Sequence, residues 1–369
     1  MDLNQVRQRL WIKLAFSNGV GPATALKLIN YFGGIEQVFN QDITNLVQVV
    51  SLVVAQNILS DQVNNEIERA LAWQQQNSTQ RRILTLEDDL YPLELAQISN
   101  PPLILFAEGN LNLLKRPKIA IVGTRHPTIQ GRDNALQFAQ NLAQSGVCIV
   151  SGLAAGIDRL AHEGALLSIN GGSTIGVIGT GIDLVYPASN RDLFQRLRSG
   201  EGLIISEFNL GTPAHMQNFP RRNRVIVGLS SACLVVESAI DGGSMISANL
   251  ALEMGREVLA IPGSIHNPMA RGCHKLIKQG AKLVEVSNDI FEELKWFSKS
   301  LTNTSNLVDV TKYSDHPVLK LLGYEPMSLD ILCTKLEIDF SDLCGQLLEL
   351  ELSGQIINCG GGYYQRSTG

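Results

Sequence analysis

The sequence lacks several features that mark whole classes of proteins. Its 369 residues carry a formal net charge of −5, which excludes a strongly basic protein of the histone type but leaves room for a local basic groove. It has no apolar run of the length that spans a membrane, and its N-terminus lacks the pattern of a secretory signal. The six cysteines lie far apart and form no C-x-x-C pair, which argues against a zinc ribbon or a disulfide scaffold. We therefore expect a soluble, reduced, cytoplasmic protein.

Familiar catalytic motifs are also missing. There is no Gly-Lys dipeptide and hence no P-loop, no G-x-S-x-G elbow, and His162-Glu163 lacks the second histidine of a zinc-protease helix. The six histidines are scattered, so we predict no metal site and no cofactor. Asp158 and His162 are four residues apart and share a helix face, which allows an acid–base pair. An acidic residue near a helix N-terminus is the simpler interpretation.

Charge and glycine content divide the chain into unequal regions. Residues 1–117 have a net charge of −2, residues 118–297 a net charge of +1, and residues 317–369 a net charge of −4. The least acidic region is also rich in glycine. Together with the patterns below, this distribution predicts a helical unit at residues 1–80, a core at 81–297, a polar linker at 298–316 and a small unit at 317–369.

The N-terminal unit has a glycine-containing turn between two apolar-periodic stretches. Gly19, Gly21 and Pro22 form this turn, and Pro22 suits the first turn of the helix that follows. The pattern is typical of a helix-hairpin-helix unit, also known from SAM-like domains, in which hairpin amides face a phosphate. A plain helical hairpin remains an equal alternative, because Lys27 is the only cation close by.

The central region alternates apolar strand-like runs with segments of helical period. Because continuous apolar strands separated by helices indicate a parallel sheet covered on both faces, we predict a doubly wound α/β fold with ligands at the carboxyl ends of the strands. Helices are expected at 133–144 and 244–255. The predicted strands are at residues 118–122, 147–150, 174–178, 203–205, 232–236, 258–260 and 282–284.

The last region combines short helices with a glycine-rich hairpin. Helices are predicted at residues 318–322, 329–336 and 342–352, and the hairpin follows from Gly354 onward. Three helices and a hairpin predict a winged-helix-like domain.

Two turns after predicted strands have the composition of phosphate-binding loops. Gly123, Thr124 and Arg125 follow the first strand, where backbone amides, a hydroxyl and a guanidinium can hold an anion. Ser151 and Gly152 follow the second strand, where small residues allow a ligand to approach closely. A turn with a surface arginine explains the first motif equally well.

The stretch FPRRNR is the most informative one. Phe219 precedes Arg221, Arg222, Asn223 and Arg224, and these arginines are the only formal charges between residues 208 and 236. Guanidinium groups bind phosphates and an aromatic ring stacks on an unpaired base, so the combination indicates single-stranded nucleic acid. The alternative is a helix start whose arginines pair with Glu207, Glu237 or Asp241.

A further glycine turn precedes the predicted helix at 244–255. Gly243 and Ser244 lie at its N-terminus, where a Gly-Gly-Ser turn forms an anion-binding nest. An ordinary helix cap is equally compatible with this sequence.

These motifs, in this order and spacing, resemble those of the DprA/Smf family of DNA-processing proteins. Supporting segments lie upstream at residues 91–109 and downstream at 280–284, so that the resemblance is strong over residues 80–297. The motifs themselves are KIAIVGTR at 118–125, SGLAAGIDRLAH at 151–162, FPRRNR at 219–224 and GGSMISA at 242–248.

The resemblance implies an extended Rossmann-like core that binds single-stranded DNA. It further implies a protein that protects incoming strands in natural transformation, helps to load the RecA recombinase and forms a homodimer through the core. By motif, the DNA-binding residues would be Gly123, Thr124, Arg125, Ser151, Gly152, Phe219, Arg222, Asn223 and Arg224, with Gly243 and Ser244 in the neighbouring turn.

Two departures qualify what the resemblance implies. Ala155 stands where the family commonly has arginine, so that one phosphate contact is missing or supplied elsewhere. The winged-helix-like unit carries three basic and seven acidic residues, whereas a duplex-binding wing should be basic. We therefore expect a protein-contact or regulatory role for residues 317–369.

The alternative function is enzymatic. Lysine-decarboxylase-like phosphoribohydrolases, nucleotide-binding enzymes of related fold, require G-G-x-G-T-x-x-E, in which the glutamate performs acid–base catalysis. After Gly242 and Gly243, this chain has no glutamate before Glu253. The sequence thus favours a binding protein without catalytic activity, and a small-molecule carrier with the same core is a third possibility.

Overall fold

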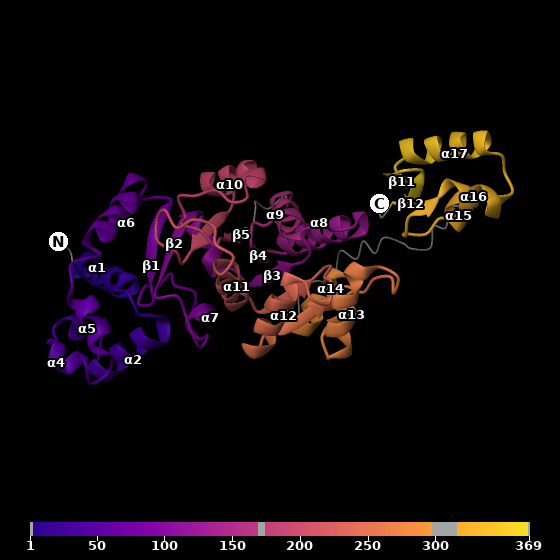
Figure 1. Cartoon of the computed structure of the whole chain (residues 1–369). Helices are drawn as coiled ribbons and strands as arrows, with labels where there is room; N and C mark the ends of the chain where they lie inside the picture. The colour runs from indigo at the N-terminus through magenta and orange to yellow at the C-terminus, as the bar shows by residue number, and fades with distance from the viewer. Residues whose placement is uncertain (1–2, 169–173, 297–315, 368–369) are drawn as a thin grey trace.

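A computed structural model describes residues 3–168, 174–296 and 316–367 (Figure 1). Most of the predicted linker at 298–316 lies outside the described residues. Within them, none of the helices combines the length and the apolar character that crossing a membrane requires.

The N-terminal part of the chain is helical and shares a hydrophobic core with the adjoining edge of the sheet. Trp73 on the last of these helices meets Phe106 edge to face, with ring centroids 5.5 Å apart. Ile83 and Ile204, on two strands, belong to the same buried cluster as the helical residues. The helices are α1 (Leu3–Phe16), α2 (Pro22–Phe32), α3 (Ile35–Phe39), α4 (Ile43–Leu46), α5 (Leu52–Leu59) and α6 (Asn64–Gln76).

The hairpin between α1 and α2 has the expected turn chemistry. Gly19 adopts φ +84°, a left-handed conformation that favours glycine, and Pro22 occupies the first turn of α2. The Lys27 ammonium group donates a hydrogen bond to the Val49 carbonyl oxygen, 3.3 Å away. Its charge is therefore already engaged within this unit.

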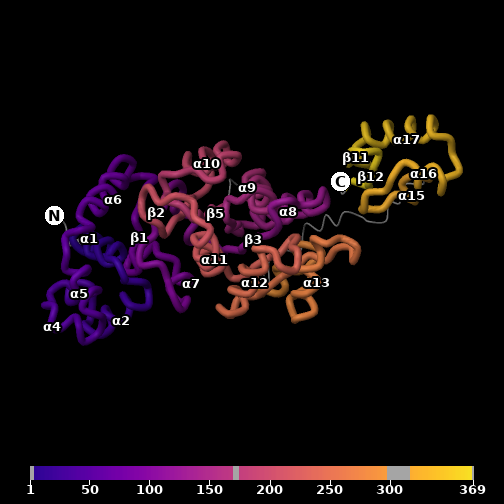
Figure 2. Tube along the Cα trace, in the orientation of Figure 1, coloured from indigo at the N-terminus to yellow at the C-terminus, as the bar shows by residue number. Residues whose placement is uncertain are grey.

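A nine-stranded sheet in the order β1-β2-β6-β5-β4-β3-β7-β8-β9 forms the centre of the described chain. Figure 2 shows β1 and β2 beside the N-terminal helices. Strands β3 to β9 are mutually parallel, whereas β2 is antiparallel to both β1 and β6. The strands are β1 (Arg81–Thr85), β2 (Ile104–Gly109), β3 (Lys118–Val122), β4 (Cys148–Ser151), β5 (Thr174–Val177), β6 (Leu203–Ser206), β7 (Ala232–Val235), β8 (Glu257–Ala260) and β9 (Lys282–Leu283).

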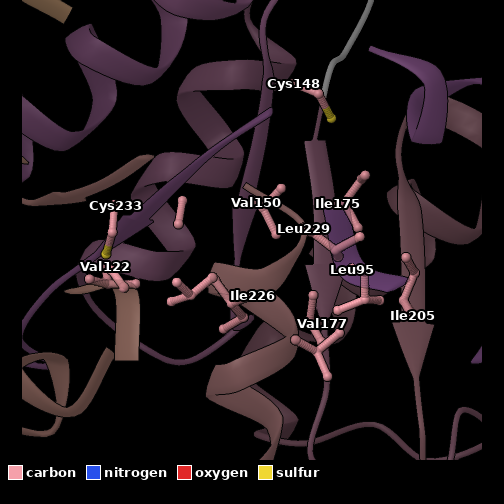
Figure 3. Close-up of a cluster of buried hydrophobic side chains, with 14 of the residues drawn as sticks. Leu95, Val122, Cys148, Val150, Ile175, Val177, Ile205, Ile226, Leu229 and Cys233 are labelled. Carbon is pink, nitrogen blue, oxygen red and sulfur yellow. The ribbon is translucent and has the colours of Figure 1, made fainter. Parts of the chain in front are cut away.

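Helices cover both faces of this sheet. Successive side chains of a strand point to opposite faces, and here those on both faces are apolar and need to be buried. Ile119 and Ile121 of β3 pack with α8, α9 and α14 on one face. Ala120 and Val122 point to the opposite face, where α7, α11, α12 and α13 complete a second buried cluster (Figure 3). The helices are α7 (Leu93–Ala96), α8 (Ile129–Gln144), α9 (Ile157–Leu166), α10 (Arg191–Arg196), α11 (Asn218–Gly228), α12 (Gly243–Glu253), α13 (Arg271–Lys278) and α14 (Ser287–Leu294).

The C-terminal unit is a winged helix with its own core. Leu332, Leu343 and Leu347 are buried there with Ile356 from the wing. Its sheet has the order β10-β12-β11. The elements are α15 (Pro317–Leu321), β10 (Met327–Ser328), α16 (Leu329–Leu336), α17 (Phe340–Leu352), β11 (Ile356–Gly360) and β12 (Tyr363–Arg366).

The predicted fold class is confirmed: a mostly parallel sheet, a helical N-terminus and a C-terminal winged helix. Every strand predicted for the central region corresponds to a strand within two residues at either end. The pair β1 and β2 was not among the predicted strands. It extends the sheet past β6 and carries the N-terminal helices.

Candidate functional site

A pocket lies at the carboxyl ends of three adjacent strands, where such a sheet is expected to bind ligands. It encloses about 490 Å³, including the part open to solvent. Its lining residues come from the loops that follow β3, β4 and β5 and from the first turns of α11. They are Arg125, Gly152, Leu153, Ala154, Ala155, Ile178, Gly179, Thr180, Tyr186, Pro187, Phe219 and Arg222.

Two aromatic rings and one guanidinium group form a wall of the pocket. The Phe219 and Tyr186 rings have centroids 5.7 Å apart and are tilted by 31°. The Arg125 guanidinium carbon lies 5.9 Å from the Phe219 centroid, within the range of a cation–π contact. Arg125 is exposed and Tyr186 is 46% exposed, so both are accessible to a ligand. This wall combines a stacking surface with a free positive charge.

Glycine leaves space for the Phe219 ring. A Cβ atom placed on Gly179 would lie 3.2 Å from Cδ1 of Phe219, closer than nearly all such contacts in proteins. The loop after β5 therefore passes directly along the ring. A larger residue at position 179 would displace the ring and narrow the pocket.

Arg222 lines the pocket but is a buried structural residue. Its side chain turns inward from α11, and one guanidinium nitrogen donates to the carbonyl oxygens of Gly152 and Val177. Burial lowers the pKa of Arg222 to about 10, and the nearby Asp158 carboxylate opposes this shift. A side chain on Gly152 would collide with Arg222, so glycine is required there. Arg222 therefore joins the loops after β4 and β5 to α11.

Asp158 and His162 belong to this buried network and do not form an acid–base pair. The Gly152 amide donates to the Asp158 carboxylate over 3.0 Å, and burial raises the pKa of Asp158 although Arg222 opposes the change. His162 is fully buried, and burial lowers its pKa to about 3. Its Nδ1 lies 2.6 Å from the Thr174 hydroxyl oxygen. The imidazole is neutral and enclosed, so it positions the backbone without reaching a substrate.

The loop after β3 is fixed by its backbone. The Thr124 amide donates to the Glu237 carbonyl oxygen over 2.8 Å, and the Thr124 carbonyl accepts from the Ile157 amide over 3.1 Å. Gly123 has no space for a side chain, because a Cβ atom would come within 2.6 Å of Ile157. These contacts hold the loop so that the Arg125 side chain projects from a rigid base.

Several predicted site residues lie elsewhere. Ser151 is fully buried, and its hydroxyl donates to the Ile121 carbonyl oxygen over 2.7 Å. Gly243 and Ser244 begin α12 and are not among the pocket residues. Ser244 is buried, and its hydroxyl donates to the Ser238 hydroxyl over 2.7 Å. Direct DNA contact by these residues stays a prediction that the geometry does not favour.

The arginines of the FPRRNR stretch have separate roles. The Arg224 guanidinium is engaged by the Glu207 carboxylate and by the Asn100 carbonyl oxygen. Burial raises the pKa of Glu207, and Arg224 opposes this shift. The Asn223 amide oxygen accepts from Nε of Arg222 over 3.2 Å. Arg221 remains exposed. Among the predicted contacts at Arg125, Arg222, Asn223 and Arg224, only Arg125 is both exposed and part of the pocket lining.

Thr180 and Tyr186 are among the pocket residues that sequence reasoning missed. Thr180 lies in a Gly-Thr-Gly turn directly after the predicted strand at 174–178, and the turns after the two preceding strands had been singled out on the same grounds. Applying that criterion to the third strand would have identified it. Tyr186 had no comparable signal, because its position beside Phe219 depends on how the loop between β5 and α10 lies against the start of α11.

Two family models match this chain. Residues 82–295 match DNA recombination-mediator protein A, and residues 311–362 match the DprA winged helix domain. Among curated proteins, Protein Smf of Escherichia coli is 39% identical over 304 residues, covering 80% of each chain. The DNA processing protein DprA of Streptococcus pneumoniae is 45% identical over 209 residues, which is 57% of this chain and 73% of that protein.

Solved structures agree with these matches. The X-ray structure of DprA from Streptococcus pneumoniae is similar with a TM-score of 0.69 at 35% identity, covering 77% of this chain and 97% of that one. A structure of DNA processing protein A from Helicobacter pylori, described for its single-stranded DNA binding mode, has a TM-score of 0.53 at 30% identity. It covers 58% of this chain and 96% of the other.

Proposed function

Because the chain belongs to the family of DNA recombination-mediator protein A, we propose that it binds single-stranded DNA in the pocket beside Phe219. In this role it protects incoming strands during natural transformation and helps to load a RecA recombinase onto them. We place this activity in the cytoplasm. The observation that carries the proposal is the wall of Phe219, Tyr186 and Arg125 at the carboxyl ends of the strands.

The chemistry of this wall suits an unpaired strand. Every base has a π-face that stacks on an aromatic ring, and a guanidinium group pairs with the phosphate that accompanies the base. Neither contact depends on the identity of the base, so we expect little sequence preference. In a duplex the base faces are already stacked on one another and are not available to Phe219.

We assign separate roles to the predicted site residues. Arg125 contacts phosphate, Phe219 stacks, and Gly152 allows the loop to pass close to Arg222. Arg222 and Arg224 support binding indirectly by holding α11, since the Arg222 guanidinium binds backbone carbonyls and the Arg224 guanidinium binds Glu207. With Ala155 in the lining, Arg125 supplies the exposed positive charge among the pocket residues.

Homodimerisation through the core is part of this proposal. The core carries large apolar side chains that are exposed in the single chain, and a contact between two cores would cover such surface. They include Ile240, Ile246, Leu252 and Ile265, which are between 43% and 73% exposed.

The proposed activity needs no chemical step. Asp158 and His162 are enclosed, and the turn before α12 lacks the glutamate that a phosphoribohydrolase requires. Incubating the purified protein with AMP and measuring ribose 5-phosphate separates the two functions. Steady release of the sugar phosphate would favour the enzyme.

The main test compares oligonucleotides of equal length. The full chain is titrated with fluorescent oligo-dT and with a duplex of the same length at several salt concentrations. We expect oligo-dT to bind more tightly, with an affinity that falls as salt rises because counterions are released. Equal affinity for the duplex, or no binding to oligo-dT, would contradict the proposal.

A further inference from the structure

Helix α17, which runs along one side of the winged helix (Figure 1), is apolar on its outer side as well as on its inner side. The inner side is buried in the core of the unit through Leu343, Leu347 and Leu350. A surface helix normally turns polar residues to water, so a second apolar row is not explained by folding. We call this row the outer stripe, and it consists of Phe340, Cys344, Leu348 and Leu352, which are all exposed.

The outer stripe is both large and open. Phe340 is 56% exposed, Leu348 is 58% exposed and Leu352 is 80% exposed. Their spacing of four residues places neighbouring members one turn apart along the helix. Anchors at this spacing are what a helix presents when it packs against a second helix.

Gly345 lies beside the outer stripe in the middle of α17. A Cβ atom placed on it would meet no atom beyond its own stretch of helix within 4 Å, so packing within the chain does not require glycine there. Glycine in a helix interior also lowers the stability of the helix relative to alanine. The missing side chain does allow a second backbone to approach α17 closely, since the distance between packed helices depends on the side chains at their contact.

Carboxylates border this surface. Asp342 and Glu349 are seven residues apart, so they lie on the same side of the helix, next to Gly345. Neither forms an ion pair with another residue in the part of the chain that the structure describes. Helix α17 has no lysine or arginine, and residues 317–369 carry three basic and seven acidic residues. The outer stripe is therefore an apolar surface with an unneutralised negative border.

The charge pattern decides among the possible occupants of this surface. Nucleic acid and anionic membranes are repelled by the carboxylates. A second winged helix packed stripe to stripe would bring a net charge of −4 against another of −4, which is unfavourable. A helix with one apolar row and lysine or arginine beside it matches both the stripe and its border.

We propose that the outer stripe of α17 binds a basic amphipathic helix of a partner protein. Apolar anchors of that helix cover the outer stripe, its backbone crosses α17 at Gly345, and its cations lie against Asp342 and Glu349. This interaction surface goes beyond the proposed function, because none of its residues lines the pocket of the core.

The test titrates the full chain with three fluorescent peptides of equal length. The first is a leucine-lysine helix whose leucines form one apolar row, the second has the same composition in scrambled order, and the third has glutamate in place of every lysine. We expect only the first peptide to bind, with an affinity that falls as salt rises. Fluorescence anisotropy measures binding, and thermal melting reports whether each variant keeps its fold.

Variants of the outer stripe and of its border should weaken binding of the first peptide. Leu348→Ala combined with Leu352→Ala should weaken it by about tenfold or more, because two anchors lose their contact. Asp342→Asn combined with Glu349→Gln should weaken it by about 2- to 30-fold, the range of two exposed ion pairs, and should flatten its salt dependence.

Gly345→Gln separates binding from folding. Glutamine is a better helix former than glycine, so this variant should melt at a higher temperature than wild type while it binds the first peptide less tightly. A purely structural role of Gly345 would not give both changes. Leu93→Ala is the matched control, because Leu93 is a 69% exposed leucine on α7 of the core, and it should bind like wild type.

Four results would overturn the proposal. They are no binding of the first peptide, equal binding of the scrambled peptide, equal binding of the glutamate peptide, and a wild-type dimer that the Leu348→Ala, Leu352→Ala variant loses in light scattering. The last result would assign the outer stripe to a second copy of the chain. None of them affects the proposed function, which the oligo-dT titration of the same protein samples tests separately.

Discussion

The pocket of the core and the winged helix at the C-terminus present opposite chemistry to solvent. The pocket exposes the Arg125 guanidinium beside aromatic rings. Helix α17, the third helix of the winged helix and hence the position of a recognition helix, contains no lysine or arginine. It carries Asp342, Glu349 and Glu351, and it exposes Phe340, Cys344, Leu348 and Leu352 at a spacing of four residues.

The difference shows that a winged-helix fold, although many such domains bind nucleic acid, does not by itself indicate that this unit binds it. Because phosphate neutralisation dominates affinity, an acidic helix cannot replace the cation of the pocket. An apolar stripe bordered by carboxylates is suited to contact with another protein. We therefore propose that the core binds DNA and that the winged helix contacts another protein, and each proposal can be tested separately.

The largest effect is expected from the buried charges on which the pocket is built. Arg222→Met leaves the Asp158 carboxylate buried without the cation that opposes its desolvation, and we expect a loss of about 3–5 kcal/mol in the free energy of unfolding. Urea denaturation measures this loss. The double variant Arg222→Met with Asp158→Asn should regain part of it. A single variant as stable as wild type would show that the network does not support the pocket.

Removal of the aromatic surface should have the next largest effect. Phe219→Ala should weaken oligo-dT binding by about 1–3 kcal/mol, because one stacked base loses its platform. Fluorescence titration at constant salt measures the change, and Phe340→Ala on α17 is the matched control in the winged helix. Equal losses in both variants would remove the distinction between the two regions.

Two arginines that look alike in the sequence should differ in salt dependence. Arg125→Ala should lower the slope of log affinity against log salt by about 0.7, the value for one lost phosphate contact with a single strand. Arg224→Ala, made together with Glu207→Gln to avoid an unpaired buried carboxylate, should leave the slope unchanged. Equal slopes in the two variants would mean that Arg224 leaves Glu207 and binds phosphate.

The smallest effect should follow from removing the winged helix. Deleting residues 317–369 should change oligo-dT affinity by less than about twofold, because the seven acidic residues of this unit outnumber its three basic ones. The same titration measures it, and duplex DNA serves as the second probe. A large loss of affinity for either probe would show that the C-terminal unit binds DNA after all.

The sheet could be predicted from the sequence because each central strand is a short apolar run between helices of regular period. The site could be predicted only in part. Arg125 follows from its position after a strand and Phe219 from the composition of the FPRRNR stretch, but the burial of Arg222 depends on which carbonyl groups surround it. Glu207 is 17 residues from Arg224, and the sequence offers it only as one of three carboxylates that could pair with an arginine of this stretch. The burial of Arg222 and the pairing of Arg224 depend on contacts between loops. Loops have little hydrophobic periodicity, so such contacts cannot be predicted from the sequence pattern.

The N-terminal helices share a hydrophobic cluster with strands β2 and β6, and this cluster determines which truncated fragments of the protein can fold. Phe106 and Ile204 pack against side chains of the N-terminal helices, including Trp73, which lies more than 30 residues before β2 in the sequence. A fragment beginning at residue 82 would leave that apolar side of the sheet bare to water and prone to self-association. We therefore expect the described residues 3–168 and 174–296 to unfold as one cooperative unit, and the winged helix, which has a core of its own, to unfold separately.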